Sequence, residues 1–205
     1  MKHRRMMLLV PLLAAVAACG SSAPSATPST SSNTATPSAS AAPTATPAAT
    51  PALQECTAPQ LEGEMDTQQG AAGTIYAGFE VRDTASVACT MQGYFGVQMT
   101  SGGGQMLALT YAPTTGNGVS PTLVTLQPDT APLNSGNDVG HAIFYMRWTD
   151  TCNTPETPAN FLFTPPQLSG SFAVPAHLAS QNTPPEVCGH VDIGPISPRG
   201  TQQPF

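Results

Sequence analysis

The sequence predicts an all-β fold: an Ig-like antiparallel β-sandwich with two disulfides, preceded by a disordered stalk. Short segments with alternating apolar and polar residues are separated by turns rich in proline and glycine, of which the 205 residues contain 22 and 18. That pattern is typical of many short strands, and no window shows the 3.6-residue apolar repeat of an amphipathic helix. Four of the five cysteines lie among the predicted strands, which indicates a fold stapled by disulfides.

The first 18 residues have the order of parts found in a secretory signal peptide. A cationic start, MKHRR, precedes an apolar run over 6–18, which is shorter than the roughly 20 residues that a membrane-spanning helix needs. The run ends in Val-Ala-Ala-Cys-Gly, and small residues before Cys19 resemble the lipobox of bacterial lipoproteins. The resemblance implies that Cys19 receives a diacylglyceryl thioether, with acyl chains such as palmitate, and starts the mature protein. The alternative is an ordinary signal peptide, with Cys19 lost or spare.

The segment over 19–52 is predicted to be a lipidated cysteine followed by a disordered linker. Beyond Cys19 it consists of Ser, Ala, Thr and Pro with one Gly, one Asn and no charged residue, a composition that cannot bury a core. We therefore expect a signal peptide over 1–18, the linker over 19–52 and one β-sandwich domain over 53–205. O-glycosylation of the linker is an alternative to a bare spacer.

Alternation of side chains predicts the strands of the domain. In GTIYAGFEVRD, residues 73–83, the apolar positions Ile75, Ala77, Phe79 and Val81 alternate with more polar ones, which gives one buried and one wet face. Trp148 ends the most apolar of the remaining segments and is expected to fill the core. Further strands are predicted at GYFGVQM (93–99), QMLALTY (105–111), TLVTL (122–126), HAIFYMRW (141–148), FLF (161–163) and HVDI (190–193).

The cysteines of the domain form an even set: Cys56, Cys89, Cys152 and Cys188. In an exported protein the default for such a set is two disulfides. Of the three pairings that four cysteines allow, we favour Cys56–Cys89 and Cys152–Cys188, which close loops of 33 and 36 residues and stabilise by about 3–4 kcal/mol each in the chain-entropy model. No two cysteines have C-x-x-C spacing, which argues against a zinc site.

One stretch of the domain resembles a known family. GTIYAGFEVRD is followed by CTMQGYFGV, residues 89–97, which is similar to the pattern Cys-Thr-Leu-x-Gly-Tyr-Pro-Gly-Val of the actinobacterial domain of unknown function 4232. The resemblance covers roughly 56–198 and all four domain cysteines. Met91 and Phe95 replace the usual Leu and Pro, and QPDTAPLNSGNDVG, residues 127–140, is longer than the family's turn. The family is often found on lipoproteins behind such a stalk, and it implies neither an activity nor catalytic residues.

The charge balance excludes two classes of partner. After the N-terminal segment the basic residues are Arg82, Arg147 and Arg199, against twelve acidic ones. Such a chain has no basic stripe to displace counterions from phosphates, so nucleic-acid binding is not expected. Charge-driven adhesion to an anionic membrane is excluded for the same reason.

Two acidic clusters are candidate sites, each weighed against a structural role. Glu62, Glu64 and Asp66 share one face of a strand, where three carboxylates suit Ca²⁺ or a pair suits acid–base chemistry on a sugar. The structural alternative is a solvated face that resists edge-to-edge aggregation. The second cluster lies in a long loop, matches no EF-hand spacing and is expected to be an ordinary polar loop. It comprises Asp129, Asn134, Asn137 and Asp138.

The remaining candidate motifs favour structural roles. Cys188, His190 and Asp192 fall on one strand face, but a metal would lack a fourth ligand there, and Cys188 is expected in a disulfide. SGGGQ, residues 101–105, is expected to be a turn rather than a phosphate loop. Gly-x-Ser-x-Gly, the hydrolase elbow, is absent from the sequence. The isolated histidines, His141 and His177, are expected to be hydrogen-bonded or exposed.

The sequence therefore predicts a lipoprotein anchored through Cys19 at the extracytoplasmic face of the cell membrane. Its sandwich is expected to be non-catalytic and to bind an envelope protein or a glycan, or to have a structural role. No catalytic residue, cofactor, metal or nucleic-acid partner is predicted. Two rival functions are a cell-wall glycan or ester hydrolase using the Glu62 face, and a carrier of lipid or small solute with an apolar cavity between the sheets.

Overall fold

The computed structural model describes residues 53–115, 118–133, 135, 140–178, 180–181 and 183–200. The chain divides into two units, Met1–Ala48 and Ala49–Phe205, and the described residues belong to the second. Cys19 and the predicted signal peptide and stalk therefore lie outside the described residues. Within the part of the chain that is described, none of the helices has the length and hydropathy to cross a membrane.

The described residues form twelve strands, one short 3-10 helix and no α-helix, so the all-β prediction is confirmed. The largest sheet has the order β2-β3-β8-β11-β6, with β12 also paired to β8, and two smaller sheets have the orders β10-β9-β5 and β1-β4-β7. The elements are β1 (Gln54–Glu55), η1 (Ala58–Gln60), β2 (Leu61–Ala71), β3 (Thr74–Asp83), β4 (Cys89–Met91), β5 (Gly96–Thr100), β6 (Thr110–Pro113), β7 (Val124–Leu126), β8 (Ala142–Thr149), β9 (Asn160–Thr164), β10 (Phe172–Pro175), β11 (Cys188–Ile193) and β12 (Ser197–Pro198).

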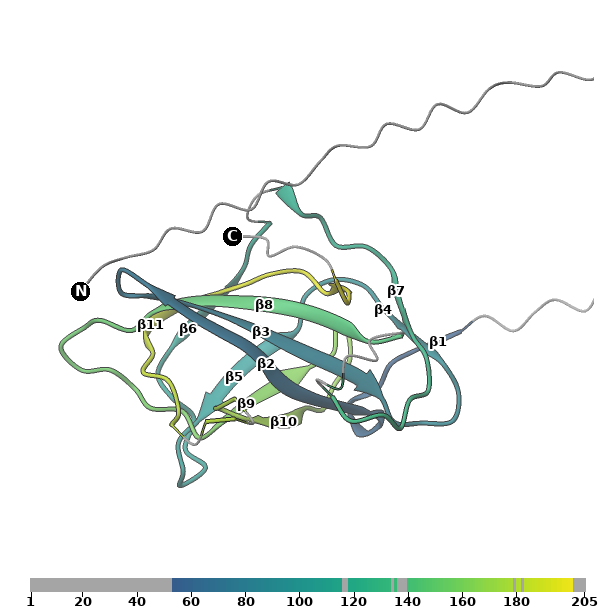
Figure 1. Ribbon diagram of the computed structural model, residues 1–205, viewed down its shortest axis with the longest axis horizontal. Coiled ribbons are helices and arrows are strands. Elements are labelled where there is room, and N and C mark those ends of the chain that lie inside the picture. The colour runs from purple at the N-terminus through teal and green to yellow at the C-terminus, as the bar shows by residue number, and fades with distance from the viewer. Residues whose placement is uncertain are drawn as a thin grey trace, which may run out of the picture. The chain divides into compact units, whose positions relative to one another are not determined.

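Aromatic rings fill the space between two layers of strands. β2, β3 and β8 run across β5, β9 and β10 (Figure 1). Five phenylalanines from both layers contact one another with ring centroids 4.7 to 5.9 Å apart, several of them edge to face, which is a favourable geometry for aromatic pairs. All five are at most 2% exposed. They are Phe79, Phe95, Phe144, Phe161 and Phe163.

The predicted alternation along β3 is confirmed. Ile75, Ala77, Phe79 and Val81 are all buried in the core, so the intervening residues face away from it. Trp148 on β8 is also buried, and its indole N–H donates to the carbonyl oxygen of Glu186 at 3.0 Å. The one tryptophan therefore fills the core, as its position at the end of an apolar strand predicts.

The hairpin between β2 and β3 has the tight turn that the strand twist favours. Ala71 pairs with Thr74 across a two-residue loop, in which Ala72 and Gly73 have φ of 50° and 78°. Two consecutive positive φ values match a type I′ turn, whose twist suits that of the flanking strands. This turn fixes the register of β2 and β3, and with it the side chains that share the outer face.

Two features of the sheets differ from the sequence prediction. β1 pairs with β4, and β11 with β6, in the parallel direction, although an antiparallel sandwich was expected. The strand predicted over 105–111 begins only at Thr110, because the preceding residues cross from β5 in one layer to β11 in the other. The phenol oxygen of Tyr111 accepts a hydrogen bond from the backbone N–H of Met99 at 3.0 Å, and this bond ties the two layers together.

Both favoured disulfides are present. Cys56–Cys89 joins the start of the described domain to β4, and Cys152–Cys188 joins the loop after β8 to the start of β11. The sequence separations of 33 and 36 residues make each loop long enough for a substantial reduction of unfolded-state entropy.

Truncating a ring at the centre of the core is expected to destabilise the fold strongly. Phe163→Ala removes a side chain that is 0% exposed and contacts several other rings, so the free energy of unfolding should fall by about 3–5 kcal/mol. Val87→Ala is the control, because Val87 is 68% exposed, and it should change stability by less than about 0.5 kcal/mol. Urea unfolding followed by Trp148 fluorescence measures both. Equal effects of the two substitutions would contradict this core.

Candidate functional site

The outer face of the six-stranded sheet has a covered end and an open groove. At the covered end, residues 127–133 and 140–141, hereafter the strap, contact outward side chains of β3. The C-terminal segment 197–200 pairs with β8 and reaches Glu80 of β3 through Arg199. At the other end, side chains of β3, β8 and β11 line a groove of about 310 Å³. β3 contributes outward positions to both ends, Glu80 to the covered end and Tyr76 to the groove.

Buried ion pairs hold the strap. Glu80 is an outward residue of β3, yet it is 0% exposed. Nδ1 of His141 lies 2.7 Å from Oε1 of Glu80, and its Nε2 lies 2.9 Å from Oδ2 of Asp129. The imidazole therefore lies between two carboxylates and pairs with both, which offsets the cost of burying them.

The C-terminal segment joins the same network through Arg199. The Nη1 atom of Arg199 lies 2.9 Å from Oδ2 of Asp66 and 3.2 Å from Oε2 of Glu80. The backbone N–H of Arg199 also donates to the carbonyl oxygen of His141 at 3.2 Å. Glu80 is therefore the common partner of the strap and the C-terminal segment.

Two further contacts fix the strap. Arg82 is 2.5 Å from Oε2 of Glu62, and its Nη1 donates to the carbonyl oxygen of Ala131. The backbone N–H of Ala131 donates to Oδ1 of Asp129 at 2.7 Å. This bond, followed by the contact with His141, holds the pKa of Asp129 below its usual value.

The groove is a row of hydrogen-bonded polar side chains. Tyr76, Arg147 and Asp192 are register neighbours on β3, β8 and β11. Oδ2 of Asp192 accepts from Nε and Nη2 of Arg147 at 3.0 and 2.5 Å, and its Oδ1 lies 3.2 Å from Nε2 of His190. The bond to Asp192 raises the pKa of the Arg147 guanidinium, and Tyr76 acts in the same direction. The groove is lined by Thr74, Tyr76, Arg147, Trp148, Thr149, His190 and Asp192.

A hydroxyl, an imidazole and a carboxylate follow one another at the edge of the groove. Oγ1 of Thr110 lies 3.0 Å from Nδ1 of His190, whose Nε2 faces Asp192. This order resembles the nucleophile, base and orienting acid of hydrolases. The Thr110 hydroxyl, however, donates to the carbonyl oxygen of Gly189 at 3.1 Å. The hydroxyl of Thr110 therefore has a backbone partner besides His190.

The predicted acidic cluster serves the covered end. A β-bulge between Met65 and Thr67 includes Asp66. Asp66 contacts Arg199, Glu62 contacts Arg82, and Glu64 stands opposite Glu80 in the register. Two of the three carboxylates are thus engaged by arginines. Such an arrangement suits neither Ca²⁺ nor the separated acid and base of a glycosidase.

The other candidate clusters do not form metal sites among the described residues: His190 and Asp192 lie side by side, but Cys188 does not join them as a ligand. A bulge between Cys188 and Val191 interrupts the strand, and the disulfide of Cys188 removes its thiolate as a metal ligand. Asp129 belongs to the strap, and its predicted partners Asn134, Asn137 and Asp138 lie outside the described residues. In the described part of the chain, no three His, Cys, Asp or Glu residues are grouped to hold a metal ion.

His177 and the SGGGQ turn have local roles. Nδ1 of His177 lies 3.0 Å from the carbonyl oxygen of Leu178, whereas His141 is central to the covered end. SGGGQ forms the expected turn, because the N–H of Ser101 donates to the carbonyl oxygen of Gln105, and that of Gly104 to the carbonyl oxygen of Ser101.

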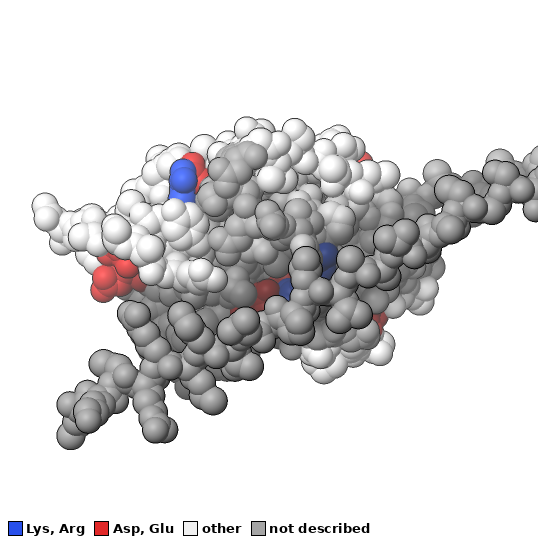
Figure 2. Space-filling view, turned by 45° about the horizontal axis from the view of Figure 1, so that its top comes forward, with Lys and Arg blue, Asp and Glu red and all other residues white. Residues whose placement is uncertain are grey.

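Charge pairing is a general property of this domain. Arg82, Arg147 and Arg199, the three arginines of the described residues, each contact a carboxylate. On the face seen in Figure 2, blue basic atoms lie against red acidic atoms on an otherwise mostly uncharged described surface. Sequence reasoning missed these pairs, although a lone arginine at a polar position of a strand is a usable signal that a carboxylate stands on a neighbouring strand.

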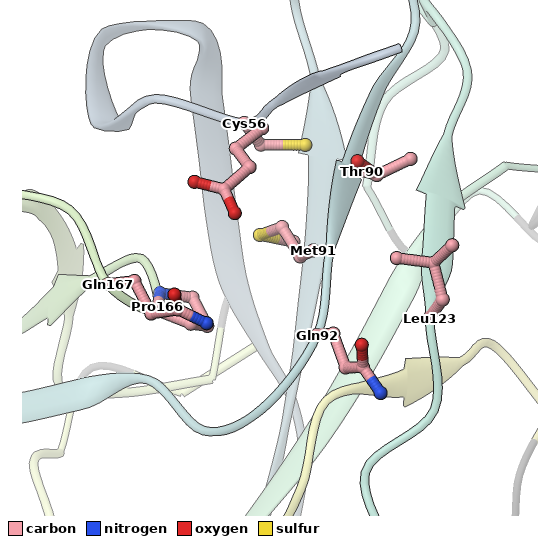
Figure 3. Close-up of a pocket in the computed structure, with 8 residues that line it drawn as sticks. Cys56, Thr90, Met91, Gln92, Leu123, Pro166 and Gln167 are labelled. Carbon is pink, nitrogen blue, oxygen red and sulfur yellow. The ribbon is translucent and has the colours of Figure 1, made fainter. Parts of the chain in front are cut away.

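A second pocket lies beside the first disulfide. Cys56, Thr90, Met91, Gln92, Leu123, Pro166 and Gln167 surround it in Figure 3. Its volume is about 90 Å³, below the roughly 300–1,000 Å³ of typical ligand pockets. The groove, at about 310 Å³, is the larger of the two.

A comparison with known families covers most of the chain. The model of the family described as "Domain of unknown function (DUF4232)" matches residues 56–197. The match includes both disulfides, the core and the groove. No curated protein and no solved structure matches the chain.

The lowered pKa of Asp129 predicts that part of the stability of the fold is lost in acid. Its pKa in the folded state is lowered, so its carboxylate stabilises the fold above its unfolded-state pKa, and this contribution is lost as the pH falls toward the folded-state pKa. Asp129→Asn should therefore lose less stability than the wild type between about pH 5 and pH 2. Urea unfolding across this range measures the difference. Glu55→Gln, at an exposed site, is the control, and parallel curves for wild type and Asp129→Asn would contradict this role.

Proposed function

We propose that this chain, which belongs to the family described as domain of unknown function DUF4232, is a lipoprotein at the extracytoplasmic face of the cell membrane. In this proposal Cys19 carries the lipid, and the β-sandwich binds an envelope partner without catalysis. The family description names no activity, so the support comes from the sequence before the domain and from the outer face of the sheet.

Two features support the anchor and the compartment. The apolar run over 6–18 followed by Cys19 resembles a lipobox, and two acyl chains would hold the chain firmly because each buried methylene contributes about 0.8 kcal/mol. Disulfides persist in oxidising compartments, and the domain has two of them. Both observations agree with export.

The groove is the observation that carries the binding function. Arg147, Asp192 and His190 contact one another in a row across it. Binding requires rigid donors and acceptors on a stable scaffold, which such a row on three paired strands supplies.

The rival functions have less support. A lipid carrier would need an apolar cavity between the layers, where the phenylalanine rings contact one another. A hydrolase built on the acidic cluster would need its carboxylates for chemistry, whereas Glu62 and Asp66 are paired with arginines. Binding at the open groove conflicts with neither observation.

Crosslinking in cells tests the binding function. A photo-crosslinking residue at Thr149, which is exposed at the groove, should give one enriched envelope adduct. The same residue at the exposed Val87, which lies on no strand and does not line the groove, should give a weaker and broader set. Mass spectrometry identifies what is attached. Equal and unspecific adducts from both positions would contradict a dedicated partner at the groove.

Substitution of the proposed lipidation residue tests the anchor. Cys19→Ala removes the only thiol in the segment before residue 53, so cells grown with alkyne-labelled palmitate should yield unlabelled protein. Ser21→Ala, two residues away, keeps Cys19 and should be labelled like the wild type. A Cys19→Ala chain that still carries the label would show that the lipid is attached elsewhere and would refute the assignment.

A further inference from the structure

We propose that the groove binds a neutral saccharide, as a short stretch of an envelope glycan. This inference rests on the proposed function, because it names the chemistry of the partner that the groove would bind. The groove is lined by one guanidinium, one carboxylate, one imidazole, one phenol and two threonine hydroxyls, together with Trp148. The ligand class follows from the charge, the hydrogen bonding and the place of these groups.

The charge of the groove disfavours ionic ligands. The guanidinium of Arg147 and the carboxylate of Asp192 are 2.5 Å apart and neutralise each other. An anion would displace Asp192 from its partner and would also approach a domain with three arginines and twelve acidic residues. A cation would compete with Arg147 for the same carboxylate. A neutral ligand has neither cost.

The hydrogen-bonding groups suit a polyhydroxylated ligand. Donors and acceptors alternate from Arg147 through Asp192 to His190, and the solvent-exposed fractions of these side chains are 39%, 21% and 55%. Each hydroxyl of a sugar both donates and accepts, so neighbouring hydroxyls can replace water along such a row. Tyr76, half-buried beside Arg147, offers a flat apolar ring for the carbon-bound hydrogens of a sugar.

The position of the groove disfavours a peptide bound as an extra strand. Strand addition requires an edge, where backbone groups await a partner. The groove lies on β3, β8 and β11, which are all interior strands in the order β2-β3-β8-β11-β6. Their backbone groups are paired with each other, so only side chains are presented to a ligand. A volume of about 310 Å³, at the lower end of ligand pockets, suits a short part of a chain.

Calorimetric titration of the full-length chain in detergent tests the proposal. The probes are neutral tetrasaccharides of glucose, mannose, arabinose and N-acetylglucosamine, with tetragalacturonate as the anionic comparison. At least one neutral probe should bind, and Tyr76→Ala should weaken its affinity at least about tenfold. The double variant R147A/D192A removes the charges as a pair and should have a similar effect. Tyr76→Phe, which keeps the ring, should lose less, and V87A should bind like the wild type.

Each other outcome overturns the inference. Binding of none of the neutral probes, binding of the anionic probe alone, or unchanged affinity in folded groove variants would each refute it. Near-ultraviolet circular dichroism of the variants establishes that they are folded. If Thr149 crosslinks to an envelope protein while no saccharide binds, the proposed function stands and this inference fails. If a saccharide binds but Cys19 carries no lipid, this inference stands and the proposed lipid anchor fails.

Discussion

The contact between Glu80 and His141 is the constraint on which the arrangement of the outer face depends. Glu80 is an outward residue in the middle of β3, and it would be solvated if nothing covered it. The strap and the C-terminal segment remove it from water completely, which is tolerable only because His141 and Arg199 contact its two oxygens at 2.7 and 3.2 Å. Breaking a buried pair of this kind typically costs about 3–5 kcal/mol. Cover and charge pairing therefore depend on each other.

The two faces of β3, β8 and β11 have different roles. The inner face supplies the aromatic core, and the outer face is divided between the covered end and the groove. Gly78 lies between these ends on β3, where an added Cβ would come within 2.9 Å of the ring of Tyr145 and 2.6 Å of Oγ1 of Thr67. A residue without a side chain is needed there for the aromatic ring of the neighbouring strand to lie flat on the sheet.

Local patterns in the sequence predicted the fold better than the site. Alternation identified β3 and β8, and the even set of cysteines with similar loop lengths identified both disulfides, because each signal lies within a short stretch or a simple count. The pairs of the outer face have no such signal: His141 is 61 residues from Glu80, and Asp192 is 45 residues from Arg147. Only the register of β3, β8 and β11 brings them together. The late start of β6 was missed because apolar alternation continues through a segment that crosses between layers.

Hydrogen exchange of a Glu80→Gln variant tests the central claim most directly. The substitution keeps the size of the side chain and removes its charge. If Glu80 holds the cover, the backbone amides of Asp129, Ala131 and Arg199, whose bonds lie in the strap and the C-terminal segment, should exchange faster than in the wild type. The amides that pair β3 with β8 beside the groove should exchange as before. Unchanged protection of the strap, or equal loss across both ends of the sheet, would contradict the account.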